Sequence, residues 1–162
     1  MGQLAVARSP ETLCARGVGS CVVVAIWDAR MALGGMAHGV LPTAAHPEPG
    51  PGSAAPARYC DTAVKALFAA LREWGARAED CRAVLVGGAS MFRAGAFSTA
   101  PALGERNRAA AFAGLAELGL PVVAEDCGGI EGRGVDLDCA DGTVTVRTGG
   151  AVRRLQKAGD AF

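Results

Sequence analysis

The sequence is short of the features that mark membrane, exported and nucleic-acid-binding proteins. Its longest uninterrupted apolar run, Cys21 to Trp27, is far below the roughly 20 residues that a membrane-spanning helix needs. Its 16 basic and 16 acidic residues balance, and Lys65 and Lys157 are its only lysines, so it lacks a polybasic patch for phosphates. The N-terminal segment lacks a charged stretch followed by an apolar one. We therefore expect a cytoplasmic protein that neither inserts into a membrane nor binds nucleic acid.

Aromatic residues and metal-binding cysteine patterns are also scarce. Aromatic side chains make up 5% of the chain, and much of its 51% apolar content is alanine, which buries little area per residue. None of the six cysteines forms a Cys-x-x-Cys or Cys-x-x-His pair, so we expect no metal site. Because disulfides are rare in the cytoplasm, each cysteine is expected to be a small buried residue unless another feature gives it chemistry.

The length and the order of apolar patterns predict one domain that mixes strands and helices. We expect this domain to span residues 1–148 and to be followed by a poorly ordered tail at 149–162. Strands are predicted at residues 20–27, 32–41, 83–88, 121–125, 134–138 and 143–147, and helices at residues 59–74 and 105–118. These elements do not follow a strict βαβ order, which favours an α/β (α+β) sandwich with mixed or antiparallel sheets flanked by helices.

Several glycine-rich or proline-rich segments have plain structural interpretations. Residues 43–57 are rich in proline and glycine, which predicts a loop that we expect to form a rim for substrate. The glycine pairs at 87–88 and 128–129 are predicted turns, because neither is followed by the Lys-Ser/Thr pair of a phosphate-binding loop. Residues 104–107 are predicted to open and cap a helix. The sequence therefore indicates no cofactor.

The segment richest in chemistry is a glycine-rich stretch that ends in Cys21, followed by a second one that ends in His38. Suppose that residues 20–27 and 32–39 pair as a hairpin centred on residues 29 and 30. Cys21 and His38 then face each other on one side of the sheet, with Cβ atoms about 4.5 to 5.5 Å apart. A slip of one residue would place them on opposite faces.

A cysteine beside a histidine has the composition of a nucleophilic site. A neighbouring imidazolium lowers the pKa of a thiol, and the thiolate is the nucleophile. The glycines allow the backbone N–H groups of Gly19, Ser20 and Val22 to approach a substrate and stabilise a tetrahedral oxyanion. The spacing alone is more typical of a structural cysteine and a structural histidine than of a catalytic pair, and both interpretations stay open at this point.

The motifs along the chain, from about residue 11 to residue 148, are GVGSCVVVAIWDA, GGMAHGVLP, RYCDTAV, VLVGGASMF, LGERNRAA, LPVVAEDCGGIEGR and DGTVTVR. In this order they resemble the chemoreceptor glutamine deamidase family, CheD. The resemblance implies that Cys21 is the nucleophile and His38 the general base in hydrolysing glutamine side-chain amides of methyl-accepting chemotaxis receptors to glutamate and ammonia. It also implies a fold similar to the catalytic domain of the cytotoxic necrotising factors and, in some members, binding to a CheC-type phosphatase.

The sequence departs from the family pattern at three positions. A threonine that is commonly catalytic in the family is Ala15 here, and Thr12 stands three residues upstream as a possible substitute. Ser90 replaces the family's asparagine, a possible substrate contact, and Cys60 replaces a glycine. The missing threonine supports an alternative function, in which a chemotaxis adaptor keeps the fold and its partner-binding surface with little or no catalysis.

Overall fold

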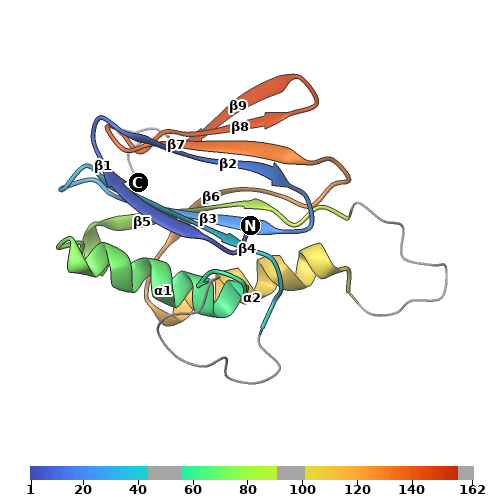
Figure 1. Ribbon diagram of the computed structural model, residues 1–162, viewed down its shortest axis with the longest axis horizontal. Coiled ribbons are helices and arrows are strands. Elements are labelled where there is room, and N and C mark those ends of the chain that lie inside the picture. The colour runs from blue at the N-terminus through green and yellow to red at the C-terminus, as the bar shows by residue number, and fades with distance from the viewer. Residues whose placement is uncertain (44–55, 91–100, 157–162) are drawn as a thin grey trace.

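The computed structural model of the protein describes residues 1–43, 56–90 and 101–156. Two β-sheets and a pair of helices form three layers, with the five-stranded sheet in the middle (Figure 1). The helices cover one face of this sheet and the four-stranded sheet covers the other. The predicted α+β sandwich with mixed and antiparallel sheets is confirmed.

The described elements in chain order are β1 (Leu4–Arg8), β2 (Thr12–Val18), β3 (Val22–Asp28), β4 (Leu33–Gly39), α1 (Cys60–Glu73), a 3-10 turn (Ala78–Asp80), β5 (Cys81–Gly87), α2 (Leu103–Glu117), β6 (Val122–Cys127), β7 (Arg133–Asp138), β8 (Val144–Thr148) and β9 (Ala151–Gln156). The middle sheet has the order β1-β4-β3-β5-β6, in which β5 and β6 are parallel and the other neighbours antiparallel. The outer sheet has the order β2-β7-β8-β9 and is antiparallel.

Strand β3 is buried on both faces, which explains its uninterrupted apolar sequence. Val22, Val24 and Ile26 pack toward the helices, and Val23 and Ala25 pack toward the outer sheet. Successive side chains of a strand point to opposite faces, so each core receives every second residue. The residues of β3 therefore separate two hydrophobic cores.

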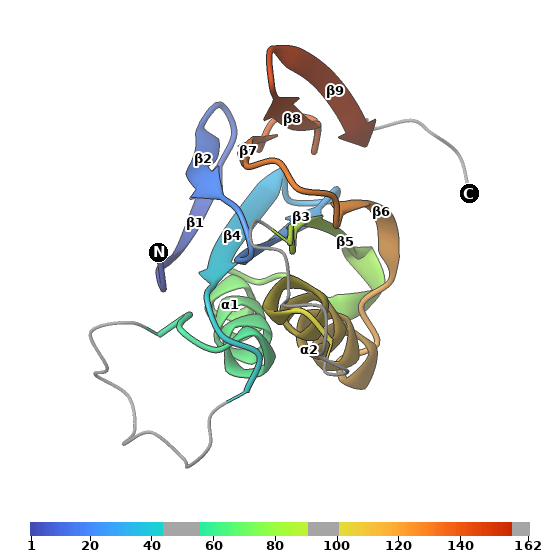
Figure 2. The same cartoon turned by 90° about the vertical axis from the view of Figure 1, so that its right-hand side faces the viewer.

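The two helices lie side by side beneath the middle sheet (Figure 2). The helix predicted at residues 59–74 is confirmed, and its spacing puts Ala63, Leu67 and Leu71 on one buried stripe. Trp74, at the same spacing, follows the last helical residue and remains 46% exposed. The Trp74 ring instead lies 5.3 Å from the guanidinium carbon of Arg8.

The expected poorly ordered tail is corrected by strand β9. Residues 151–156 pair with β8 at the edge of the outer sheet, whereas residues 157–162 lie outside the described part of the chain. The side chains at 151–154 are exposed, so β9 carries no apolar pattern that would predict it. Backbone hydrogen bonding to β8 holds it in place, a contribution that side-chain patterns do not report.

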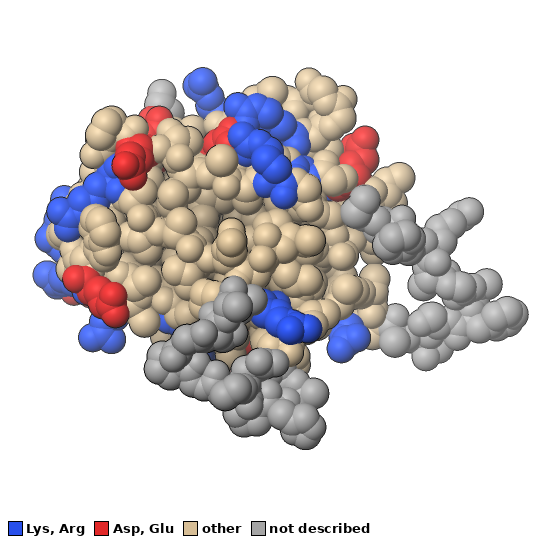
Figure 3. Space-filling model, viewed as in Figure 1, with Lys and Arg blue, Asp and Glu red and all other residues tan. Residues whose placement is uncertain are grey.

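The surface carries charged side chains of both signs, in keeping with the balanced composition. On the face shown in Figure 3, charged side chains gather toward the margins around an uncharged centre.

Within residues 1–43, 56–90 and 101–156, every helix is too short or too polar to cross a membrane. Most of the predicted rim, residues 44–55, lies outside the described chain.

Candidate active site

The predicted β3–β4 hairpin forms, but its register differs from the predicted one by two residues. Val23 pairs with His38, and the ladder closes at Asp28 and Leu33. The connecting loop is therefore 29–32, whereas the predicted pairing of residues 20–27 with 32–39 leaves 28–31 as the connection. The observed loop is held by a hydrogen bond from the Met31 N–H to the Asp28 carboxylate (3.0 Å). Moving the centre of the hairpin by one residue shifts the partner of every strand residue by two positions.

A shift of two residues preserves the face of each side chain, whereas a shift of one would not. Cys21 directly precedes the first residue of β3, and the ladder ends at the pair of Val22 and Gly39, one residue after His38. The two residues therefore lie at the same end of the hairpin. The predicted direct pairing of Cys21 with His38 is wrong, because His38 pairs with Val23 and Cys21 lies outside the ladder.

The backbone of Cys21 is held by the end of β5. The ladder between β3 and β5 includes Val22 and Gly87, and the Gly88 N–H extends it by donating to the Cys21 carbonyl (2.7 Å). Gly87 has φ +122°, and a Cβ there would overlap that carbonyl oxygen. The predicted turn at residues 87–88 therefore also clamps the cysteine.

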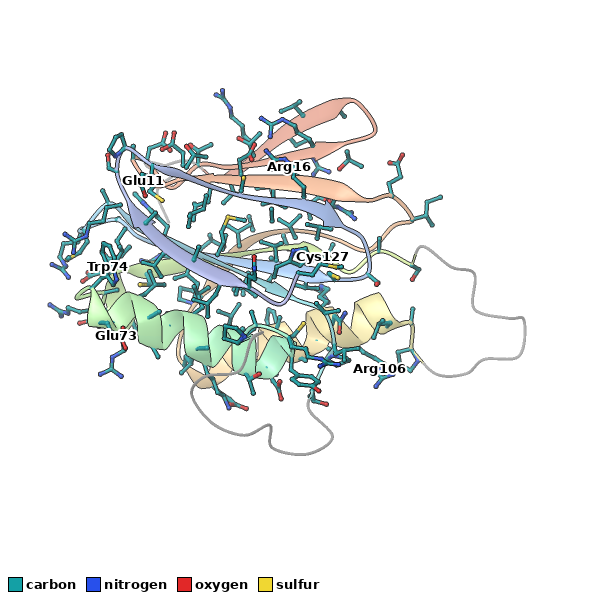
Figure 4. The ribbon with its side chains drawn as sticks, in the orientation of Figure 1. Glu11, Arg16, Glu73, Trp74, Arg106 and Cys127 are labelled. Atoms are coloured by element: carbon teal, nitrogen blue, oxygen red, sulfur yellow. The ribbon has the colours of Figure 1, made fainter. Side chains whose placement is uncertain are left out.

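The site lies at the end of the sandwich where β3 and α2 begin and β5 ends. In Figure 4, Arg106 and Cys127 are toward this end, whereas Glu11 and Trp74 are toward the opposite end. Cys21 is 7% exposed, and its Sγ contacts Met1 Sδ at 3.9 Å. The Cys21 thiol is thus buried close to the surface.

His38 projects from β4 into the space between the two sheets. It is 8% exposed and borders a cavity of about 230 Å³ that Met1, Ala15 and Met36 also line. Cys21 does not line this cavity, but Met1 touches both. Among the described residues, nothing hydrogen-bonds to the buried His38 Nε2. This nitrogen therefore remains available to exchange a proton.

Burial decides the charge of both groups in the free protein. It raises the pKa of the Cys21 thiol above its ordinary 9.0 and lowers the pKa of the His38 imidazole below its ordinary 6.5. Removal from water disfavours whichever form is charged. The expectation that an imidazolium lowers the pKa of Cys21 is therefore wrong here. At neutral pH the pair consists of a thiol and a neutral imidazole.

The position of the missing threonine faces His38, and its suggested substitute does not. Ala15 of β2 lines the same cavity as His38 from the opposite sheet. Thr12 is exposed and lines a different pocket, with Asp136 and Asp138. Residues three apart in a strand point to opposite faces, so Thr12 lies on the outer side of the outer sheet.

The loop before Cys21 offers amide groups that could bind an oxyanion. Within the described chain, the N–H groups of Gly19, Ser20 and Cys21 donate to no backbone carbonyl. Val22 lies inside the ladder, paired with both Gly39 and Gly87, which makes its N–H the least available of the predicted set. The loop amides are therefore the better donors.

Ser90 lies beside this loop, at the edge of the described chain. Its side chain is exposed, and its N–H donates to the Gly129 carbonyl (2.8 Å). The preceding residue, Ala89, donates its N–H to the Gly19 carbonyl (2.9 Å). Ser90 thus follows directly on the segment that pairs with the glycine-rich turn.

Asn107 was missed as a site residue, because its segment was interpreted as a helix cap. It lies inside α2, which begins at Leu103, and is fully buried. Its Nδ2 donates to the carbonyls of Ser20 (2.8 Å) and Val40 (2.9 Å). The signal was present in the sequence, since Asn107 stands at helical spacing from the buried Ala111.

The described residues hold no group of three or more His, Cys, Asp or Glu side chains arranged to bind a metal ion. The chemical groups at this end of the sandwich are a thiol, an imidazole and backbone amides. Such a set can support nucleophilic attack on a carbonyl, with the imidazole moving the proton.

Comparisons with known proteins confirm the resemblance carried by the motifs. The family described as CheD chemotactic sensory transduction matches residues 40–148. A Methanococcus vannielii protein named probable chemoreceptor glutamine deamidase CheD is 37% identical over 155 residues, 96% of each chain. The chemoreceptor glutamine deamidase CheD of Thermotoga maritima is 35% identical over 156 residues, 96% of this chain and 94% of the relative. Over almost its whole length, the chain belongs to the CheD family.

Proposed function

We propose that this protein is a glutamine deamidase that acts on chemoreceptors, with Cys21 as nucleophile and His38 as general base. The observation that supports the proposal is the position of both residues at the same end of the β3–β4 hairpin in a member of the CheD family. The relatives in Methanococcus vannielii and Thermotoga maritima are named as chemoreceptor glutamine deamidases. The net reaction converts a glutamine side chain and water into glutamate and ammonia.

The neutral state of the pair favours general-base attack over a preformed thiolate. As the substrate amide approaches, His38 takes the Sγ proton of Cys21 while Sγ bonds to the amide carbon. The oxyanion that forms is stabilised by the loop amides near Gly19 and Ser20. The carbon–nitrogen bond then breaks, and the imidazolium gives its proton to the departing ammonia.

The second half of the reaction repeats the proton movements with water as nucleophile. His38 removes a proton from water, the hydroxyl bonds to the thioester carbon, and the carbon–sulfur bond breaks. The imidazolium then returns the proton to the Cys21 sulfur, while the new glutamate leaves. Both halves use the same nitrogen, and the free Nε2 of His38 suits this role.

A second candidate function is a chemotaxis adaptor with weak catalysis. The observation that favours it is Ala15, which lines the His38 cavity where the family commonly has a threonine. Loss of one hydrogen bond made in the transition state typically costs about 10²- to 10³-fold in rate. The adaptor would bind a receptor or a CheC-type phosphatase in the cytoplasm through a surface that does not depend on Cys21.

The deciding experiment incubates the full-length protein with a glutamine-containing cytoplasmic fragment of a chemoreceptor. Ammonia release and peptide mass spectrometry report the conversion of glutamine to glutamate. Cys21→Ala should lower the rate by at least about 10³-fold, because the nucleophile is removed. Cys81→Ala is the matched control, since it removes another buried thiol at the far end of β5.

Full activity in Cys21→Ala would contradict the mechanism. No conversion by the native protein, together with receptor binding that survives Cys21→Ala, would support the adaptor instead. Similar losses of activity in Cys21→Ala and Cys81→Ala would show that the loss comes from disturbed folding and not from removal of a nucleophile.

A further inference from the structure

The end of the hairpin next to the site is joined by a side chain rather than by strand pairing. The β3–β4 ladder stops at Val22 and Gly39. Beyond this pair the two chains diverge, because the N–H groups of Val40 and Leu41 both turn away to the Arg58 carbonyl (3.0 Å each). The segment that carries Cys21 and the segment that follows His38 therefore share no backbone hydrogen bond at this level among the described residues.

Asn107 closes this gap. One amide nitrogen donates to the carbonyl of Ser20, the residue before Cys21, and to the carbonyl of Val40, two residues after His38. Both hydrogens of the nitrogen are used, so one planar group sets the separation of two backbones. Asn107 thus links the two strand ends in place of a further backbone pair; we call this link the Asn107 rung.

The helix that carries Asn107 is itself fixed against the site. Gly104 lies one turn earlier in α2 and approaches Gly88 so closely that a Cβ at position 104 would overlap the Gly88 carbonyl. The N–H of Gly88 in turn holds the carbonyl of Cys21. The close contact between Gly104 and Gly88 thus fixes the start of α2, which carries Asn107, relative to the backbone of Cys21.

The polar contacts of the Asn107 side chain with the described residues are all made by its nitrogen. Its Oδ1 is buried and has no hydrogen-bond partner among them. The two donated bonds therefore connect this side chain to the Cys21 and His38 segments and to no other described polar group.

From these contacts we infer that Asn107 is a positioning residue, which sets the distance and orientation between Cys21 and His38 through the carbonyls of Ser20 and Val40. The inference rests on the proposed function, in which these two residues catalyse the reaction. Without the Asn107 rung, the loop amides and the thiol can move relative to the imidazole. Displacements of about 1 Å can lower a catalytic rate by about 10²-fold.

The test compares two variants of Asn107 with a matched variant of the same helix. Asn107→Ala removes both donated bonds, and Asn107→Asp keeps the shape but places an oxygen against two carbonyls. Leu115→Ala is the matched variant, because it also truncates a fully buried side chain of α2. The Leu115 side chain is apolar and therefore forms no hydrogen bond to the segments that carry Cys21 and His38. Thermal unfolding is measured for each variant, and assays are run well below the lowest transition.

Both Asn107 variants should lower kcat by about 10- to 100-fold and leave KM nearly unchanged, because bound substrate meets a misaligned pair. Leu115→Ala should destabilise the protein and retain native kcat. Native kcat in Asn107→Ala, or an equal loss of kcat in Leu115→Ala, would overturn the inference. Asn107→Ala keeps the test valid if Asn107→Asp does not fold. Cys21→Ala is assayed alongside, since activity in that variant would refute the proposed function itself.

Discussion

The two ends of the β3–β4 hairpin are both held by a fully buried polar side chain, yet they do different work. At the closed end, the Asp28 carboxylate accepts hydrogen bonds from the N–H groups of Met31 (3.0 Å) and Arg77 (3.4 Å). Arg30 lies 3.9 Å from the same carboxylate. These contacts fix the loop and tie it to the segment before β5.

At the open end, the Asn107 amide donates to carbonyls on two diverging chains. Asp28 thus accepts where N–H groups would be unpaired, and Asn107 donates where carbonyls would be unpaired. The closed end determines the register, and the open end lies beside Cys21. We therefore expect changes at the closed end to affect folding and changes at the open end to affect chemistry.

The largest expected effect is on stability, at the closed end. Asp28→Ala should lower the free energy of unfolding by about 3 kcal/mol, because two buried N–H groups lose their acceptor. Urea denaturation measures the loss. The rate of receptor deamidation per folded molecule should be unchanged. A large loss of that rate would show that the two ends are not separable.

The next prediction concerns the backbone that holds Cys21 at the open end, and it compares variants of two glycines with positive φ, Gly87 and Gly17. Gly87→Ala should strain the backbone by about 1–3 kcal/mol and also displace the Cys21 carbonyl, which lowers activity. Gly17→Ala is the control, because Gly17 has φ +68° and no other described atom within 4 Å of an added Cβ. Activity and urea denaturation are measured for both. Equal losses of activity would contradict the clamp on Cys21.

A smaller effect is expected from restoring the hydroxyl that faces His38. Ala15→Thr should raise the deamidation rate by about 10-fold or more, because the hydroxyl can hold the imidazole in the transition state. Ala15→Val is the control, since it has the shape of threonine without its hydroxyl. If the two variants have the same rate, the cavity does not need a hydrogen-bonding partner for His38.

The smallest effect is the pH dependence of the open end. Because burial lowers the pKa of His38, the unfolded chain binds a proton more readily than the folded one. The associated stability is fully present above pH 6.5 and declines as pH falls from 6.5 toward the lower pKa of the folded state. Urea denaturation at several pH values gives the slope of the free energy of unfolding against pH, which is compared between the native protein and His38→Gln. The acid limb of kcat/KM should likewise lie below pH 6.5.

That last prediction also has an outcome that would refute it. A native protein whose stability is no more sensitive to acid than that of His38→Gln would show that the imidazole is not desolvated. An acid limb above pH 6.5 would show that a charged partner raises its pKa during catalysis.

Local patterns predicted the interior elements and one edge strand, β6, and missed the other three edges. The apolar run of β3 and the helical stripe of α1 are confirmed because burial on a core leaves a periodic sequence. Strands β1, β2 and β9 were not predicted. Each lies at the edge of a sheet and exposes many of its side chains, so its apolar pattern is short and weak although some of its residues pack on a core.

By itself, the sequence determined the family and the class of fold, and it suggested Cys21 and His38 as candidate catalytic residues. Both could be assigned to one hairpin because each stands at the end of an apolar or glycine-rich strand pattern. The tertiary structure decided the register, the charge of the pair and the contacts of Ala15 and Asn107. These depend on how a loop closes, how much water is excluded and which distant segments meet, and no local spacing encodes them.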